Sequence, residues 1–281
     1  MAVSRARRNR FAELGAHAVL LTFTIIAMFP VILIIINSFK SKRAIFREPL
    51  ALPNSDSFDL IGYSTVLTQG NFPLYFWNSL SVTLASLFFV LLFGAMAAFA
   101  LSEYKFPFNR LTGLYLALGI MIPIRLGTIG ILKLMVATGL VDTLWALILV
   151  YTAQGLPLAI FILSEFMSVV SKDLKSAGRI DGLSEYAIFF RLVMPLVRPA
   201  LATVGVFTMI PIWNDLWFPL ILAPSEATKT MTLGAQVFVG QFTNNWNAII
   251  AAMALAIIPV IILYTIFSRQ LISGLTSGAV K

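Results

Sequence analysis

The chain has 281 residues, of which 59% are hydrophobic and 11% charged, and its formal net charge is +8. Ordinary soluble domains are roughly 45–50% apolar and about 25% charged, so a soluble fold of this length could not bury so much apolar surface. The composition therefore excludes a soluble domain and predicts an integral membrane protein. Because the sequence has no cysteine, disulfides and thiolate metal sites are also excluded.

Six apolar runs predict an all-α membrane protein made of a single transmembrane domain over residues 1–281. A helix that crosses a bilayer needs about 20 apolar residues. The predicted spans are 14–39, 78–101, 111–131, 143–164, 199–222 and 248–268. The third is free of charge only over 111–124, so we extend it past Arg125, which then lies near the outer face.

The first run follows a basic segment, as a signal peptide does, but it is longer than the roughly 7–15 apolar residues of a signal core. No small-x-small cleavage site closes it, so we interpret it as a retained helix. With both termini in the cytoplasm, 13 of the 20 Lys and Arg lie inside, which the positive-inside rule favours. We therefore assign the basic excess to the membrane and not to nucleic acid.

The segment 170–198 predicts a helix–turn–helix on the cytoplasmic side. Ser171 is placed to cap a helix that has Asp173 in its first turn. One face of that helix is apolar and the other is basic: the first carries Val170, Leu174 and Ala177, the second Lys172, Lys175 and Arg179. Asp181 and Gly182 form the turn, since glycine adopts left-handed backbone at little cost.

A second short helix is expected to begin at Ser184, with Leu183 and Ile188 as a hydrophobic staple. One face of this helix is predicted to carry an aromatic stripe of Tyr186, Phe189, Phe190 and Val193, and Pro195 to end it. Two interpretations stay open from the residues alone. The segment either lies on the lipid surface as an amphipathic element or docks another protein through its aromatic anchors.

The segment KSAGRIDGLS at 175–184, followed by VMPL at 193–196 and Pro199, resembles the EAA loop of ABC importer permeases. The resemblance implies that the first helix couples to an ATPase subunit. It assigns docking to Ser176, Ala177, Gly178, Asp181, Gly182, Tyr186, Phe189, Phe190 and Pro195. Two positions depart from the pattern: Ser176 stands where the family usually has glutamate, and Gly178 where it has the second alanine. Whether the missing glutamate alters coupling is left open.

Three further stretches resemble the carbohydrate branch of these permeases, particularly the maltose type. They are WNDLWFP at 213–219, TLG at 232–234 with Asn245 and Trp246, and the C-terminal GLTSGAVK at 274–281. The tail has no apolar periodicity to hold a helix, so physics alone predicts a frayed end. The resemblance instead implies that Gly274, Thr276, Gly278 and Lys281 reach the interface between two ATPase subunits.

The resemblance also implies the type I importer permease fold and a place in the bacterial inner membrane, with both termini cytoplasmic. The implied partners are a second permease subunit, an ATPase dimer, an extracytoplasmic solute-binding protein and membrane lipid. The chain itself has no phosphate loop of the form GxxxxGK[ST]. No cofactor is therefore expected on it, and ATP with magnesium would be bound by the partner subunits.

Charged and aromatic residues inside the spans are candidates for the solute path: Trp213, Asn214, Asp215, Trp217 and Arg125. Asp215 either contacts solute or braces helices, and Arg125 either faces a cavity or extends to the outer surface. The tryptophans either stack on sugar rings or belong to the interfacial belt.

The single histidine, His17, gives no metal site and no base for a nucleophile, so an enzyme is not expected. An importer subunit for a sugar, oligosaccharide or glycoside is the predicted function. The alternative is a secondary transporter driven by an ion gradient, which would need paired ionisable residues at mid-membrane or an internal repeat. The sequence does not identify the solute.

Overall fold

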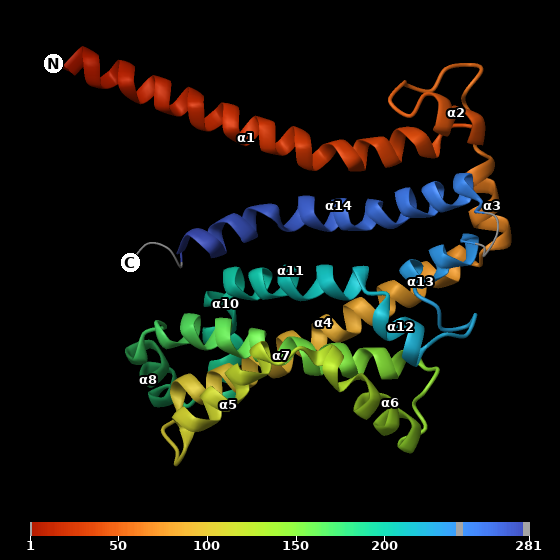
Figure 1. Cartoon of the computed structure of the whole chain (residues 1–281). Coiled ribbons are helices and arrows are strands. Elements are labelled where there is room, and N and C mark those ends of the chain that lie inside the picture. The colour runs from red at the N-terminus through yellow and green to blue at the C-terminus, as the bar shows by residue number, and fades with distance from the viewer. Residues whose placement is uncertain (1, 240–243, 278–281) are drawn as a thin grey trace. The chain divides into compact units, whose positions relative to one another are not determined.

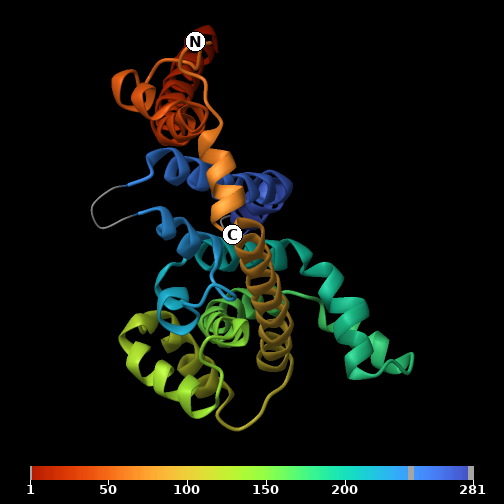
Figure 2. The ribbon, with the colours of Figure 1, turned by 90° about the vertical axis from the view of Figure 1, so that its right-hand side faces the viewer.

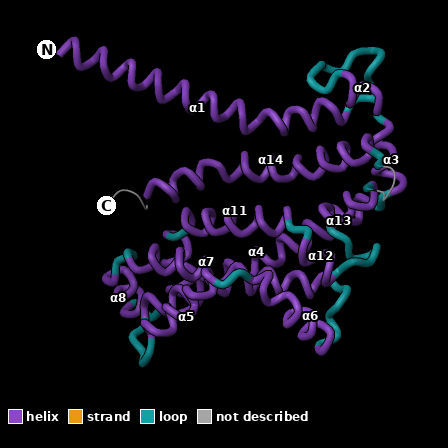
Figure 3. Tube along the Cα trace, viewed as in Figure 1, coloured by secondary structure: helices purple, strands orange, loops and turns teal. Residues whose placement is uncertain are grey.

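The computed structural model describes residues 2–239 and 244–277. Their backbone forms helices and loops, with two isolated β-bridges in the loops (Figure 3). Contacts divide the chain into two compact units, one of residues 1–70 and 235–257, the other of 71–234 and 258–281. The single transmembrane domain predicted above stays a prediction.

The first unit contains α1 (Ala2–Ser38), α2 (Lys42–Arg47), α3 (Ile61–Gln69), the 3₁₀ turn η3 (Gln236–Phe238) and the beginning of α14 (Trp246–Ser277). Lys40, directly after α1, is buried, and its ammonium donates to Asn37 Oδ1 at 3.2 Å and to the Glu48 carbonyl at 2.8 Å. Burial lowers the pKa of Lys40, while the Glu48 carboxylate opposes that shift. The Asn247 side chain donates to the Lys40 carbonyl at 2.8 Å, which ties α14 to the end of α1.

The second unit is a bundle in which α4 (Phe72–Glu103) lies along α7 (Leu144–Ser168) (Figure 1). Small residues bring the two backbones together. A Cβ on Gly94 would lie 2.8 Å from Ala159 Cβ, and a Cβ on Gly155 would lie 2.7 Å from Val90 Cγ2. In lipid the hydrophobic effect does not drive helices together, so close packing between small residues contributes to their association.

Three helices are long and apolar enough to cross a membrane: Glu13–Ser38, Phe72–Glu103 and Leu144–Ser168. They agree with the first, second and fourth predicted spans. Two bent pairs raise the number to five in the part of the chain searched, and Trp246–Ile262 is a shorter apolar helix. The prediction of six spans is therefore not confirmed in number.

The third predicted span, 111–131, is wrong as a single helix. It is built from α5 (Asn109–Met121), the 3₁₀ turn η1 (Ile124–Gly127) and α6 (Thr128–Ala137), with a bend of 87°. Ile122 has extended backbone, with φ −83° and ψ 115°. Pro123 explains the break, because proline disfavours helical backbone at the residue before it.

The fifth predicted span, 199–222, is also interrupted, because α11 (Arg198–Asn214) ends before α12 (Trp217–Leu222) begins. Asp215 between them has extended backbone, with ψ 135°. Its carboxylate accepts from the backbone N–H of Trp217 at 3.3 Å and of Phe218 at 3.1 Å. A side chain that bonds the first amides of a following helix favours a new helix start over continuation.

Candidate functional site

The segment after α7 forms the predicted helix–turn–helix and projects from the helices of the second unit (Figure 2). Its first helix, α8 (Lys172–Ile180), begins where Ser171 Oγ accepts from the Asp173 amide at 3.2 Å. It ends in a turn where Gly182 has φ +80°. The Leu183 amide donates to the Gly178 carbonyl at 2.9 Å, so the turn closes back on α8. The predicted cap and glycine turn are confirmed.

The second helix begins as predicted at Ser184, whose Oγ accepts from the Ala187 amide at 3.2 Å. It runs through α9 (Glu185–Ala187), the π-helical stretch η2 (Ile188–Val193) and α10 (Met194–Leu196). The prediction that Pro195 ends this helix is wrong, because Met194 keeps helical backbone at φ −56° and ψ −42°. The winding changes from π to α at Met194, so residues 194–196 act as the first turn of a new α-helix. Proline is tolerated in a first turn because the backbone N–H that it lacks would have no helical partner there.

The helix α8 turns its apolar side chains outward and buries two residues, Lys175 and Gly178. Ile180 is 86% exposed and Leu174 39%, and Ala177 is exposed as well. Lys175 is only 3% exposed. Gly178 is buried where α8 crosses the second helix, and a Cβ there would lie 2.9 Å from Leu192 Cδ1. This close approach explains a glycine at a position where the resembled loop has alanine.

The predicted aromatic stripe is divided between a surface and a core. Tyr186 is 71% and Phe190 49% exposed, whereas Phe189 and Val193 are buried. The Phe189 ring packs 5.3 Å from Phe99 of α4, measured between centroids, inside a core shared with α7 and α11. Phe189 therefore belongs mostly to this core, where it also lines a cavity of about 320 Å³ with Tyr186 and Met96, and the expectation that it lies on the outer docking face is corrected. The π-helical winding contributes, because it offsets the 3.6-residue spacing from which the stripe was predicted.

Four outward residues of the segment that were expected to dock, namely Ser176, Ala177, Asp181 and Gly182, are exposed. The exposed residues of the two short helices and their turn are called here the loop surface: Leu174, Ser176, Ala177, Ile180, Asp181, Gly182, Tyr186 and Phe190.

Behind the loop surface lies a network of ion pairs that the sequence pattern did not indicate. Glu103, the last residue of α4, pairs through Oε2 with Lys175 and through Oε1 with Arg179, the latter at 2.8 Å. Arg179 Nε also pairs with Glu185 at 2.7 Å, and the Tyr104 hydroxyl donates to Glu185 at 2.7 Å. Lys175, Arg179 and Glu185 are neighbours in sequence, but nothing local signals a carboxylate more than 70 residues away.

This network shifts the ionisation of its members outside the membrane. The Arg179 guanidinium and the Tyr104 hydroxyl lower the pKa of Glu185 to about 2. Burial and the hydrogen bond to Glu185 raise the pKa of Tyr104 to about 12. At neutral pH Glu185 is therefore ionised and Tyr104 protonated, which are the states that this hydrogen bond needs.

A second polar cluster surrounds Asp215 at the break between α11 and α12. Arg125 Nη2 pairs with Asp215 Oδ1 at 3.3 Å, and the Tyr151 hydroxyl of α7 donates to Oδ2 at 2.8 Å. The side chain of Asp215 is 9% exposed and that of Arg125 66%. Oδ1 is bonded by Arg125 of η1 and Oδ2 by Tyr151 of α7, and both oxygens also accept amides at the start of α12. Asp215 therefore links η1, α7 and α12.

Arg125 is exposed on one side of this cluster, beside a cavity of about 610 Å³ between α5, η1 and α7. Its guanidinium carbon lies 5.8 Å from the centre of the Trp217 ring. Gln154 of α7 also lines the cavity and was not among the expected path residues. Of the two candidate tryptophans, Trp217 is 41% exposed, whereas Trp213 is buried edge-on against Phe76.

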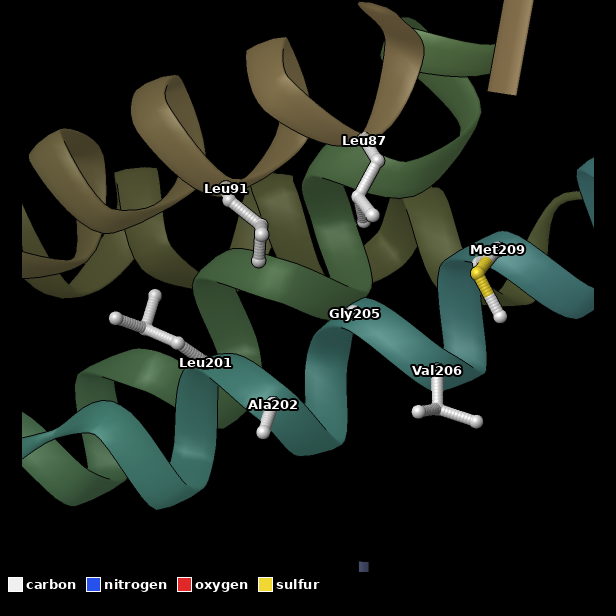
Figure 4. Close-up of a pocket in the computed structure, with 7 residues that line it drawn as sticks. All are labelled: Leu87, Leu91, Leu201, Ala202, Gly205, Val206 and Met209. Atoms are coloured by element: carbon white, nitrogen blue, oxygen red, sulfur yellow. The ribbon is translucent and has the colours of Figure 1, made fainter. Parts of the chain in front are cut away.

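Asn214 is exposed, and its amide donates to the Ile210 carbonyl one turn back, at 3.0 Å. A smaller cavity of about 260 Å³ lies between α4 and α11 and is lined by Leu87, Leu91, Leu201, Ala202, Gly205, Val206 and Met209 (Figure 4). Its side chains carry no hydrogen-bonding group, so it does not suit a hydroxylated solute.

The tail differs from the expectation of a frayed end. The helix α14 continues to Ser277, so Gly274 and Thr276 are in helical backbone. Gly278 and Lys281 lie outside the described residues. Among the residues that the structure describes, no group of three His, Asp or Glu side chains is arranged to hold a metal ion.

Comparison with known proteins identifies the family. Residues 90–276 match the family model for the binding-protein-dependent transport system inner membrane component. The match covers well over half of the chain, which therefore belongs to this family of inner membrane transport proteins. The membership agrees with the resemblance stated above, and it gives no support to a secondary transporter driven by an ion gradient.

Curated relatives match over nearly their whole length. The chain is 30% identical to the diacetylchitobiose uptake system permease protein NgcG of Streptomyces coelicolor, with 97% of this chain and 90% of NgcG covered. It is 31% identical to the arabinooligosaccharides transport system permease protein AraQ of Halalkalibacterium halodurans, with 91% and 92% covered. A crystal structure of a bacterial ABC transporter that imports alginate contains a chain with the same fold, at TM-score 0.78 and 24% identity over 94% of this chain and 97% of that one.

Proposed function

We propose that the chain is the permease subunit of an ATP-driven importer of oligosaccharides or glycosides, coupled to its ATPase through segment 170–198. The observation that carries the proposal is the loop surface. Ile180 and Tyr186 are 86% and 71% exposed on either side of the Gly182 turn, in a segment that ion pairs hold against α4. Exposed apolar side chains on a braced support are typical of a protein interface.

The loop surface suits a protein partner better than a lipid surface. An amphipathic helix on lipid needs free Lys and Arg beside its apolar face to contact phosphates. In α8, Lys175 and Arg179 are instead paired with Glu103, and Arg179 also with Glu185. The two cations and two carboxylates of the network sum to zero charge. The remaining charges of α8, the exposed Lys172 and Asp173, are of opposite sign, so α8 offers anionic lipid little net attraction.

The proposed assembly contains a second permease subunit, two ATPase subunits and an extracytoplasmic solute-binding protein. The name of the family and the alginate transporter solved in complex with an alginate-bound periplasmic protein support the last of these. ATP with magnesium would be held by the ATPase subunits, because this chain has no phosphate loop. We place the chain in the inner membrane with both termini in the cytoplasm, as the distribution of Lys and Arg favours.

A saccharide as solute is supported by the relatives, which are named for diacetylchitobiose and arabinooligosaccharides. Within the chain we propose that the solute is contacted by Arg125, which lines the 610 Å³ cavity, and by Trp217, whose ring centre lies 5.8 Å from the Arg125 guanidinium carbon. Guanidinium donors and an exposed aromatic ring suit the hydroxyls and the apolar faces of a sugar. Asp215 neutralises Arg125 and keeps it in position, which suits an uncharged solute.

Cysteine crosslinking tests the docking surface, since the chain has no native cysteine. In membranes that contain the whole transporter, Ile180→Cys and Tyr186→Cys should each crosslink to the ATPase subunit. Phe189→Cys is the matched control: it lies in the same helix–turn–helix but is 4% exposed, and it should not crosslink. If the two exposed cysteines react only with lipid-phase reagents, the segment is a surface helix and the proposed coupling is wrong.

Uptake into proteoliposomes tests the solute. The purified transporter, supplied with its binding protein, should import diacetylchitobiose or an arabinooligosaccharide when ATP is enclosed, and the uptake should fall in Trp217→Ala. Methionine, the solute of another structurally similar ABC importer, serves as a control from outside the sugars. Import of methionine and of no saccharide would contradict the proposed solute class.

A further inference from the structure

The ion-pair network behind the loop surface connects the helix–turn–helix to one membrane helix. Lys175 and Arg179 are four residues apart, so they lie on the same side of α8. Both bind the carboxylate of Glu103, one through each oxygen, and the side chain of Glu103 is only 10% exposed. The contact therefore has a fixed geometry and is partly shielded from water, unlike most surface ion pairs.

The second half of the helix–turn–helix is tied to the same end of α4. Arg179 bonds Glu185 through Nε at 2.7 Å and through Nη2 at 3.1 Å. Tyr104, the residue after α4, donates to Glu185 at 2.7 Å. The inner end of α4 thus holds both short helices, and Arg179 is bonded to both carboxylates.

The helix α4 is in turn closely fitted to α7. The contacts of Gly94 with Ala159 and of Gly155 with Val90 leave no space for even one added methyl group. Packed interiors transmit displacement because they have few voids. A shift of the inner end of α4 therefore carries α7 with it.

We propose that Glu103 is a positioning residue that passes movement of α8 to the pair α4–α7. This inference rests on the proposed function, in which an ATPase moves α8. Glu103 does not contact the solute or ATP. It holds α8 and α4 together as one body, so that displacement of the loop surface becomes displacement of the membrane helices.

The distance between α8 and α4 during ATP turnover tests this directly. Spin labels would be attached to Lys172→Cys on α8 and Met96→Cys on α4, both at exposed positions of a cysteine-free chain. In the assembled transporter, trapping with ATP and vanadate should leave the distance distribution unchanged, because the two helices move together. With Glu103→Gln added, the distribution should shift or broaden on trapping, because α8 then moves without α4.

The number of ATP molecules hydrolysed per saccharide imported gives a second readout. A residue with a merely structural role would not change this ratio. Glu103→Gln should raise the ATP hydrolysed per saccharide imported by about tenfold, as expected from loss of one charge-assisted hydrogen bond. Lys175→Gln should raise the ratio less, because Glu103 keeps its ion pair with Arg179. The double variant should recover part of the loss caused by Glu103→Gln, because no Lys175 ammonium is then buried without its partner. Asp173→Asn, at an exposed position in the first turn of the same helix α8 and outside the ion pairs of the network, is the matched control and should keep the normal ratio.

Each outcome decides the question. If Glu103→Gln lowers assembly or thermal stability while the distance and the ATP ratio stay normal, the residue is only structural and the proposal is overturned. An unchanged distance and ratio in a normally assembled variant also overturn it. If the unsubstituted chain assembles with no ATPase subunit, it is the proposed function that fails.

Discussion

Replacement of Gly182 tests whether the turn of the helix–turn–helix determines coupling. Gly182 has φ +80°, and a Cβ added there would meet no atom within 4 Å. A substitution at this position therefore introduces backbone strain without a steric clash. For an L-residue the left-handed region costs about 1–2 kcal/mol, with a β-branched side chain at the upper end.

A cost of this size lowers the population of the native turn relative to its alternatives by a factor of about 5–30. In those alternatives the Leu183 amide leaves the Gly178 carbonyl, and α8 meets the second helix at another angle. The loop surface would then no longer match the ATPase. Gly182→Val should accordingly reach normal levels in the membrane but lose most of its solute-stimulated ATP hydrolysis and transport.

The series Asn, Ala, Val at this position separates backbone strain from other effects. Asparagine tolerates left-handed backbone, so Gly182→Asn should retain most activity, Gly182→Ala less and Gly182→Val the least. The assay is saccharide-stimulated ATP hydrolysis by the purified transporter, normalised to the amount of assembled complex. Normal stimulation in Gly182→Val, or equal losses in the Asn and Val variants, would refute the reasoning.

Three further predictions concern other parts of the chain. Gly234→Ala should destabilise the purified protein by about 1–3 kcal/mol, because its Cβ would lie 2.1 Å from the buried Tyr75 ring; Gly113→Ala, in open space, should leave the melting temperature unchanged. Deletion of residues 275–281 should preserve insertion and assembly but lower transport per ATP, and an unaltered ratio would mean that the tail is dispensable. Because the pKa of Glu185 is lowered to about 2, its pairing stabilises the fold above its ordinary pKa of 4.5 and is lost as pH falls toward 2. The melting temperature should therefore fall less between pH 5 and 2 in Glu185→Gln than in the unsubstituted chain, and equal slopes would contradict the assignment.

Local features of this chain could be predicted from its sequence. The caps at Ser171 and Ser184 and the turn at Gly182 depend on residues within one or two helical turns, and the sequence specifies them. The first, second and fourth spans follow from apolar length alone. The breaks at Pro123 and Asp215 have local signals as well, namely a proline and a carboxylate placed to bond following amides, but both signals lie in apolar stretches long enough to predict uninterrupted spans.

Features that depend on distant residues could not be predicted. The pairing of Lys175 with Glu103 joins positions 72 residues apart in sequence, and no periodicity reveals it. The burial of Phe189 but not of Phe190 depends on where Phe99 of α4 lies and on a π-helical stretch that shifts the spacing. A single sequence also does not show which face of α8 packs against the rest of the chain, because that face is set by the ion pairs of Lys175 and Arg179 with the distant Glu103.

The outward apolar side chains of α8 and the second helix have a consequence for the life of the subunit before assembly. In the proposed orientation, a copy that has inserted but not yet met its ATPase keeps Ile180, Tyr186 and Phe190 in the aqueous cytoplasm. Exposed apolar groups of this kind favour aggregation and are what chaperones and quality-control proteases recognise. Surplus subunits should therefore be short-lived, and the cellular amount of this protein should follow the supply of its ATPase more closely than its own rate of synthesis.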